Sequence, residues 1–142
     1  MRILGIDYGD ARIGLALSDA SATLCGRAWT LTEWNLDRAV AAIADVVRTE
    51  GVERIVLGLP KNMDGTEGER AAKSRKLAKT VEIWSGLPVR MWDERQTTCA
   101  AADLLDESGT FGSRRKEILD SVSATVILED YLAWRKEHPG EI

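Results

Sequence analysis

The 142-residue sequence contains very little histidine and cysteine, and these shortages exclude several kinds of catalytic site. Its one histidine, His138, lies four residues from the C-terminus, on a tail that we expect to be frayed. A Ser-His-Asp triad, a Cys-His pair or a two-histidine ribonuclease site would have to use this residue. The two cysteines, Cys25 and Cys99, lack metal-ligand spacing and are expected to be reduced thiols. Hydrolytic chemistry therefore falls to carboxylates, lysines or hydroxyls.

Long apolar runs and an excess of positive charge are also missing. No apolar run approaches the roughly 18 residues of a membrane helix, and no leader precedes the first strand-like segment, so we expect a cytoplasmic protein. With 23 acidic and 19 basic residues the net charge is −4, so a nucleic-acid partner would need a local basic patch. A composition of 44% hydrophobic and 30% charged residues fits one globular domain over residues 1–142.

The hydrophobic pattern predicts an α/β fold. Extended segments are expected at residues 2–8, 12–18 and about 25–32, and short turns between them are typical of an antiparallel meander. Strands at 53–59 and 87–92 then alternate with helices, which favours parallel pairing. Helices are expected from Asn35 to Gly51, after Thr66, from Thr97 or Thr98 to Leu105, and from Ser113 to about Lys136. The result is a mixed five-stranded sheet, three strands antiparallel and two parallel, flanked by helices.

Two local expectations concern the helix after Thr66. Thr66 and Glu69 have the spacing of a capping box, in which each side chain bonds the backbone N–H of the other residue. The basic residues of this helix are expected to face outward, and its inward face is expected to consist of Ala71, Ala78, Val81 and Trp84.

Three acidic residues on three different elements are candidate catalytic metal ligands. Asp7 closes the first apolar strand, Glu94 follows the strand at 87–92, and Asp120 lies on an apolar stripe of the last helix, where aspartate has poor propensity. Mg²⁺ and Mn²⁺ prefer such oxygen ligands, and two such ions can clamp a phosphodiester without any histidine. Because adjacent strand residues point to opposite faces, only one of Asp93 and Glu94 should face the same site as Asp7.

Structural alternatives stay open for each acid. Asp7 can be a turn-capping aspartate, Glu94 can belong to a solvated acidic pair at the start of a helix, and Asp120 can pair with Lys116. Basic and polar residues near the expected mouth of the site are candidate phosphate ligands, although a solvated face is their alternative role. They are Lys61, Asn62, Arg95, Arg114, Arg115 and Lys116.

Four motifs occur in a fixed order: Ile6–Gly14, Gly58–Thr66, Asp93–Thr98 and Ile118–Ala124. Together they resemble the YqgF/RuvX family of pre-16S rRNA nucleases, formerly described as Holliday junction resolvases. The resemblance implies a ribonuclease-H-like fold, an acidic Mg²⁺ or Mn²⁺ site at Asp7, Glu94 and Asp120, and 5′-end maturation of precursor 16S rRNA. Two positions depart from the family pattern, since Asp10 stands where Thr or Ser is frequent and Gln96 where Leu is frequent.

Three other functions compete with this interpretation. A resolvase of branched DNA would keep the chemistry but needs a stable two-fold dimer, whereas we expect a monomer or weak homodimer. An actin-like or sugar-kinase ATPase would need a second domain to close around the nucleotide. A non-catalytic RNA-binding or ribosome-assembly module would not need the three acids.

Overall fold

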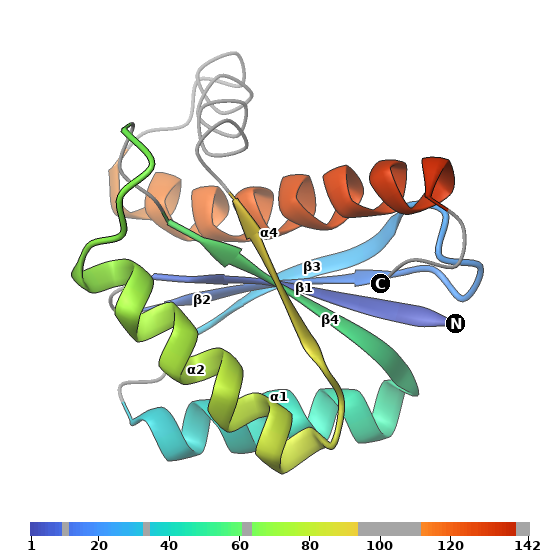
Figure 1. Cartoon of the computed structure of the whole chain (residues 1–142), viewed down its shortest axis with the longest axis horizontal. Helices are drawn as coiled ribbons and strands as arrows, with labels where there is room; N and C mark the ends of the chain where they lie inside the picture. The colour runs from blue at the N-terminus through green and yellow to red at the C-terminus, as the bar shows by residue number, and fades with distance from the viewer. Residues whose placement is uncertain (10–11, 33–34, 61–63, 94–111, 139–142) are drawn as a thin grey trace.

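A five-stranded mixed sheet forms the centre of the structure, which is a computed structural model. The structure describes residues 1–9, 12–32, 35–60, 64–93 and 112–138, and for residues 112–121 it describes the backbone alone. Its strands are β1 (Arg2–Tyr8), β2 (Ile13–Ser18), β3 (Cys25–Leu31), β4 (Val52–Leu59) and β5 (Val89–Asp93). Their order across the sheet is β3-β2-β1-β4-β5 (Figure 1). The β1–β2 and β2–β3 pairs are antiparallel and the β1–β4 and β4–β5 pairs parallel, which confirms the predicted fold class.

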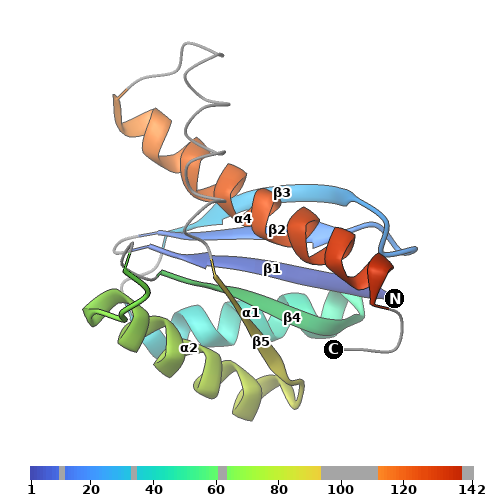
Figure 2. The same ribbon diagram turned by 45° about the horizontal axis from the view of Figure 1, so that its top comes forward.

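Helices cover both faces of the sheet. Helices α1 (Leu36–Glu50) and α2 (Glu69–Ser85) lie on one face, and α4 (Gly112–Glu137) lies on the other (Figures 1 and 2). The alternation of side chains along each strand divides the core in two: Leu4 and Ile6 pack with α1 and α2, whereas Ile3 packs with α4. Within the described residues, no helix is both long and apolar enough to cross a membrane.

The ends of α1 follow the sequence prediction, but the start of α2 does not. The Asn35 side chain accepts a hydrogen bond from the Arg38 backbone N–H, and Gly51 ends α1 in the left-handed conformation. At α2, the hydroxyl and backbone N–H of Thr66 both donate to Asp64 Oδ1, at 2.6 and 3.0 Å. The predicted capping box is therefore wrong, because the nearer carboxylate engages Thr66 and the N-cap is Gly68.

The inward face of α2 also differs from the prediction at its last turn. Ala71, Ala78 and Val81 are buried as expected, but Trp84 is 52% exposed. The buried stripe continues from Val81 by four residues to the half-buried Ser85, whose hydroxyl donates to the Val81 carbonyl. Trp84, three residues after Val81, consequently falls on the solvent side.

Helix α4 crosses β1 at Gly5. A Cβ atom at this position would lie 2.9 Å from Leu128 Cβ and 3.1 Å from the Ala124 carbonyl oxygen, so only glycine permits the observed approach. Farther along, Arg135 Nη2 lies 3.9 Å from Met1 Sδ. Helix α4 therefore runs antiparallel to β1, and its N-terminal half extends toward the end of that strand.

The crossing at Gly5 generates a stability prediction. Gly5→Ala should lower the free energy of unfolding by about 1–3 kcal/mol, because the added methyl group forces α4 away from the sheet. Gly26→Ala is the matched control, since its Cβ would meet no atom closer than 3.5 Å. Urea unfolding of both variants measures the difference, and equal stabilities would contradict the proposed close packing.

Candidate functional site

Asp7 is a buried carboxylate near the end of the central strand β1. Its exposure is 8%, and the period of two along β1 places it on the same face as Ile3 and Gly5, the face covered by α4. Leu4 and Ile6 point to the opposite core. Burial of a charged carboxylate costs free energy unless cations or hydrogen-bond donors compensate it, so this position suits a ligand of a cation.

Glycines flank Asp7 on both neighbouring strands. Gly14 of β2 is its register partner. On β4, Leu57 is the partner of Ile6, so the parallel register puts the next residue, Gly58, in the row of Asp7. Neither neighbouring strand therefore carries a side chain next to Asp7 on this row of the sheet.

The end of β5 separates Asp93 from the face of Asp7. Met91 packs with the α1–α2 core, and Trp92 packs with the α4 core. Alternation then assigns the exposed Asp93 to the side of Met91, opposite to Asp7. Glu94 lies outside the described residues, so its predicted role as the ligand from this segment stays a prediction. The next position of an extended strand would return to the face of Asp7.

The path of α4 carries position 120 toward the same end of the sheet. Ala124 lies against Gly5, and Asp120 is one helical turn earlier, in the direction of the end of β1 where Asp7 lies. Helical periodicity puts position 120 on the face of α4 that also carries Ala124 and Leu128. The side chain of Asp120 is outside the described part of the structure. The backbone thus brings positions 7 and 120, two of the three predicted ligand positions, to one edge of the sheet. The third predicted ligand, Glu94, directly follows β5 in the sequence.

The structure describes no side chain of the predicted phosphate ligands. Lys61, Asn62 and Arg95 lie outside the described residues, as do Asp10 and Gln96. Arg114, Arg115 and Lys116 belong to the first turns of α4. Among the residues that the structure describes, no group of three or more His, Cys, Asp or Glu side chains is placed to hold a metal ion. Binding of a metal ion by Asp7 therefore depends on ligands from the undescribed positions.

The histidine and the described cysteine lie away from Asp7. His138 stacks on Trp134 with ring centroids 4.5 Å apart, and its Nδ1 is 2.8 Å from the Trp134 carbonyl oxygen. This contact lies at the end of α4 near the start of β1, and the rest of the tail, residues 139–142, is outside the described part of the structure. The thiol of Cys25 is free, and burial raises its pKa, which keeps it protonated at neutral pH. Neither residue fits a nucleophile or general base beside Asp7.

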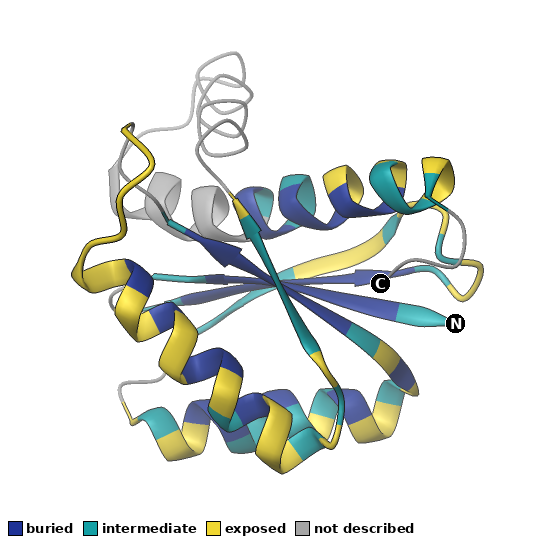
Figure 3. Cartoon of the chain, in the orientation of Figure 1, coloured by how far each residue is buried: buried dark blue, intermediate teal, exposed yellow. Residues whose placement is uncertain are grey.

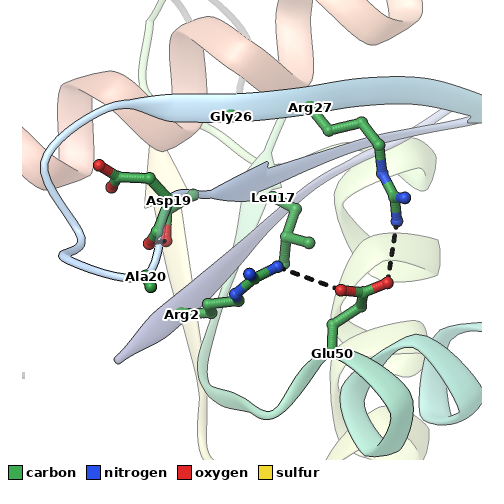
Figure 4. Close-up of a pocket in the computed structure, with 8 residues that line it drawn as sticks. Arg2, Leu17, Asp19, Ala20, Gly26, Arg27 and Glu50 are labelled. Carbon is green, nitrogen blue, oxygen red and sulfur yellow. Dashed lines mark hydrogen bonds and ion pairs between the residues drawn. The ribbon is translucent and has the colours of Figure 1, made fainter.

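A cavity of about 270 Å³ lies at the opposite end of the sheet, where β1 begins and α1 ends (Figure 4). Glu50 joins two arginines there: its carboxylate oxygens lie 3.1 Å from Arg2 Nη1 and 3.4 Å from Arg27 Nη2. Asp19 also lines the cavity, and hydrogen bonds from the Thr23 backbone and the Ser21 hydroxyl lower the pKa of this carboxyl. The two cations and two carboxylates balance, so the cavity offers no excess of positive charge for a phosphate. Sequence reasoning missed this cluster because its members are distant along the chain.

Comparisons with known proteins agree with the fold and with the four motifs. A family model described as "RuvX: Holliday junction resolvase" matches residues 1–134. A Moorella thermoacetica protein described as "Putative pre-16S rRNA nuclease" is 42% identical over 132 residues, 93% of this chain and 94% of that protein. One from Symbiobacterium thermophilum with the same description is 39% identical over 141 residues, 99% and 98% of the two chains. The structure of T. thermophilus RuvC in complex with Holliday junction substrate matches with a TM-score of 0.63 at 16% identity, covering 96% of each chain, and shows that the fold is ribonuclease-H-like.

The position of Asp7 generates a metal-binding prediction. Asp7→Asn keeps the size of the side chain and removes its charge, so Mn²⁺ binding should weaken by about tenfold or more while the protein stays folded. Asp93→Asn is the control, because Asp93 lies on the opposite face of the sheet and should leave Mn²⁺ affinity unchanged. Calorimetric titration measures the affinities and circular dichroism the folding. If Asp7→Asn binds Mn²⁺ as tightly as the wild-type protein, Asp7 is not a ligand of the metal ion.

Proposed function

The chain belongs to the RuvX family, and from that membership we propose that it is a nuclease, a hydrolase of phosphodiester bonds that depends on divalent metal ions. The family match confirms the resemblance to this family that the four motifs indicated. The observation that carries the proposal is the burial of Asp7 at the end of β1, on the sheet face that α4 covers and at the edge where the parallel strands β4 and β5 also end. A carboxylate at that place in a ribonuclease-H-like sheet is suited to hold a hard cation against a phosphate.

We propose that its substrate is precursor 16S rRNA and that the reaction is the maturation of the 5′ end, in the cytoplasm. The support comes from the names of relatives that are 39–42% identical over nearly the whole chain. No feature among the described residues distinguishes RNA from DNA, so the choice of substrate depends on these relatives.

Asp7, Glu94 and Asp120 are the residues proposed to hold Mg²⁺ or Mn²⁺. Bound ions of this kind supply an activated water and stabilise the charge of the leaving oxygen. The three carboxylates would position the ions. Lys61, Asn62, Arg95, Arg114, Arg115 and Lys116 would bind phosphates on either side of the cleaved bond, where their charge offsets the repulsion between the acids and the substrate.

A second candidate function is the resolution of branched DNA. The matching family model carries the description Holliday junction resolvase, and this description favours branched DNA as the substrate. Symmetric cleavage of a four-way junction requires a two-fold dimer. Light scattering at the working concentration therefore separates the two functions, since a monomer, or a dimer that dissociates readily, is the expectation for the RNA nuclease.

The cleavage prediction compares two acids that are adjacent in the sequence. Glu94→Gln and Asp120→Asn should each reduce Mn²⁺-dependent cleavage by about 100-fold or more, because each removes a metal ligand. Asp93→Asn should retain most of the activity. A labelled precursor rRNA is assayed beside a four-way DNA junction of equal length. An active Glu94→Gln with an inactive Asp93→Asn would reverse the assignment, and full activity without all three acids would favour a non-catalytic module.

The basic run at the start of α4 generates a salt-dependence prediction. Replacing Arg114, Arg115 and Lys116 together by alanine should weaken RNA binding about equally for different sequences. The slope of log affinity against log salt should flatten by about 0.7–0.9 for each phosphate contact that is lost. Fluorescence anisotropy at several salt concentrations gives the slope, and an unchanged slope would place the run on a solvated face.

A further inference from the structure

The outer face of α2 is strongly basic in a chain whose net charge is negative. The helix carries five basic residues and two acidic residues, whereas the whole chain has 19 basic and 23 acidic residues. Its inward face packs on the sheet through small and apolar residues, and all five cations are exposed. Figure 3 shows the exposed side of α2 turned away from the sheet. The basic residues are Arg70, Lys73, Arg75, Lys76 and Lys79.

Neighbouring carboxylates neutralise only part of this charge. Both Glu67 oxygens accept hydrogen bonds from Arg75, at 2.6 and 2.7 Å, and Lys73 Nζ lies 3.9 Å from Glu69 Oε1. The other acid of the helix, Glu82, accepts a hydrogen bond from the backbone N–H of Val89. Three cations have no ion pair with any residue in the described part of the chain: Arg70, Lys76 and Lys79.

The spacing of the basic residues fits an extended polyanion better than a single small anion. Arg70, Lys73, Lys76 and Lys79 follow one another at intervals of three residues. At 1.5 Å per residue they extend over about 14 Å of the helix axis. Each three-residue step falls about 60° short of a full turn, so Arg70 and Lys79 lie about 180° apart around the axis, whereas Lys73, Lys76 and Lys79 lie within about 120° of one another on the outward side. One strand of a nucleic-acid duplex advances about 3.4 Å per phosphate, so the roughly 9 Å of axis from Lys73 to Lys79 matches about three phosphates.

The basic row begins at the edge of the sheet that carries the proposed metal site. Helix α2 starts at Glu69, after the short connection that follows the end of β4, and it runs back toward the start of β5. Figure 1 shows its first turn on the side where β1 and β4 end. Asp7, however, faces α4 on the other side of the sheet. The α2 face is therefore placed to hold a segment beside the cleaved bond, not the cleaved phosphate.

We propose that the outer face of α2 binds the phosphate backbone of nucleic acid, through Lys73, Lys76 and Lys79, on a segment that flanks the bond cleaved at the Asp7 edge. The inference rests on the proposed function, because it assigns these residues to the same substrate. Phosphate contacts of this kind carry no base sequence information, so they should contribute to the affinity for every sequence and to its salt dependence.

The test measures binding separately from cleavage. In an Asp7→Asn background, Lys73→Gln/Lys76→Gln/Lys79→Gln should weaken binding of a fluorescein-labelled RNA duplex by about tenfold or more near 0.1 M salt, and flatten the salt slope by about 2–3 units. The matched control is Arg38→Gln/Arg48→Gln/Lys136→Gln, which removes three exposed cations from α1 and α4. This control changes the net charge equally and should keep most of the affinity and slope. Circular dichroism checks that both triple variants are folded.

The outcomes separate the inference from the proposed function. Equal affinities and slopes for the two triple variants would overturn the inference while leaving cleavage by the wild-type chain intact. A wild-type chain that binds the duplex through α2 but cleaves no precursor RNA would overturn the proposed function and support the inference. A chain whose Asp7→Asn form binds neither the RNA duplex nor the corresponding DNA duplex would overturn the inference, whatever the cleavage assay gives.

Discussion

The close approach of α4 to β1 at Gly5 determines where the acidic residues can meet. With Leu128 and Ala124 directly against the glycine, steric contact sets the position of the helix along the strand. That contact places the turn containing Asp120 beyond Ala124, toward the end of β1. A side chain at Gly5 would separate the layers, and the geometry between α4 and Asp7 would change with them.

The alternation of the strands then decides which acids can cooperate. Asp7 lies on the α4 face, between strands that carry glycine on the same row, so its carboxylate has few neighbours within the sheet itself. On β5 the same alternation assigns Trp92 to that face and Asp93 to the other. Asp93 therefore lies on the wrong side of the sheet to act with Asp7, and Glu94 as the ligand from this segment stays a prediction. Packing of the two hydrophobic cores thus restricts the chemistry at the edge.

Features set by local periodicity could be predicted from the sequence, whereas features set by competition between neighbours could not. The strand pairing, the Asn35 cap and the end of α1 at Gly51 each follow from patterns over a few residues. The capping box failed because Asp64 engages Thr66 first, and Trp84 is exposed because Ser85 continues the buried stripe. In the Arg2–Glu50–Arg27 cluster, Glu50 is 48 positions from Arg2 and 23 positions from Arg27, so no local sequence pattern could predict it.

The distribution of charge links the acidic edge to the rest of the molecule. A site built from carboxylates repels a polyanion, and a chain with net charge −4 offers no general attraction. Cations close to the site must compensate, and in the described structure the excess of basic residues on α2 starts at the edge where Asp7 lies. Exposed charges more than about 10 Å apart are largely screened at 0.1 M salt, so cations elsewhere on the surface contribute little to this compensation. The location of the basic residues, more than their number, therefore decides whether an acidic chain can hold a nucleic acid against an acidic site.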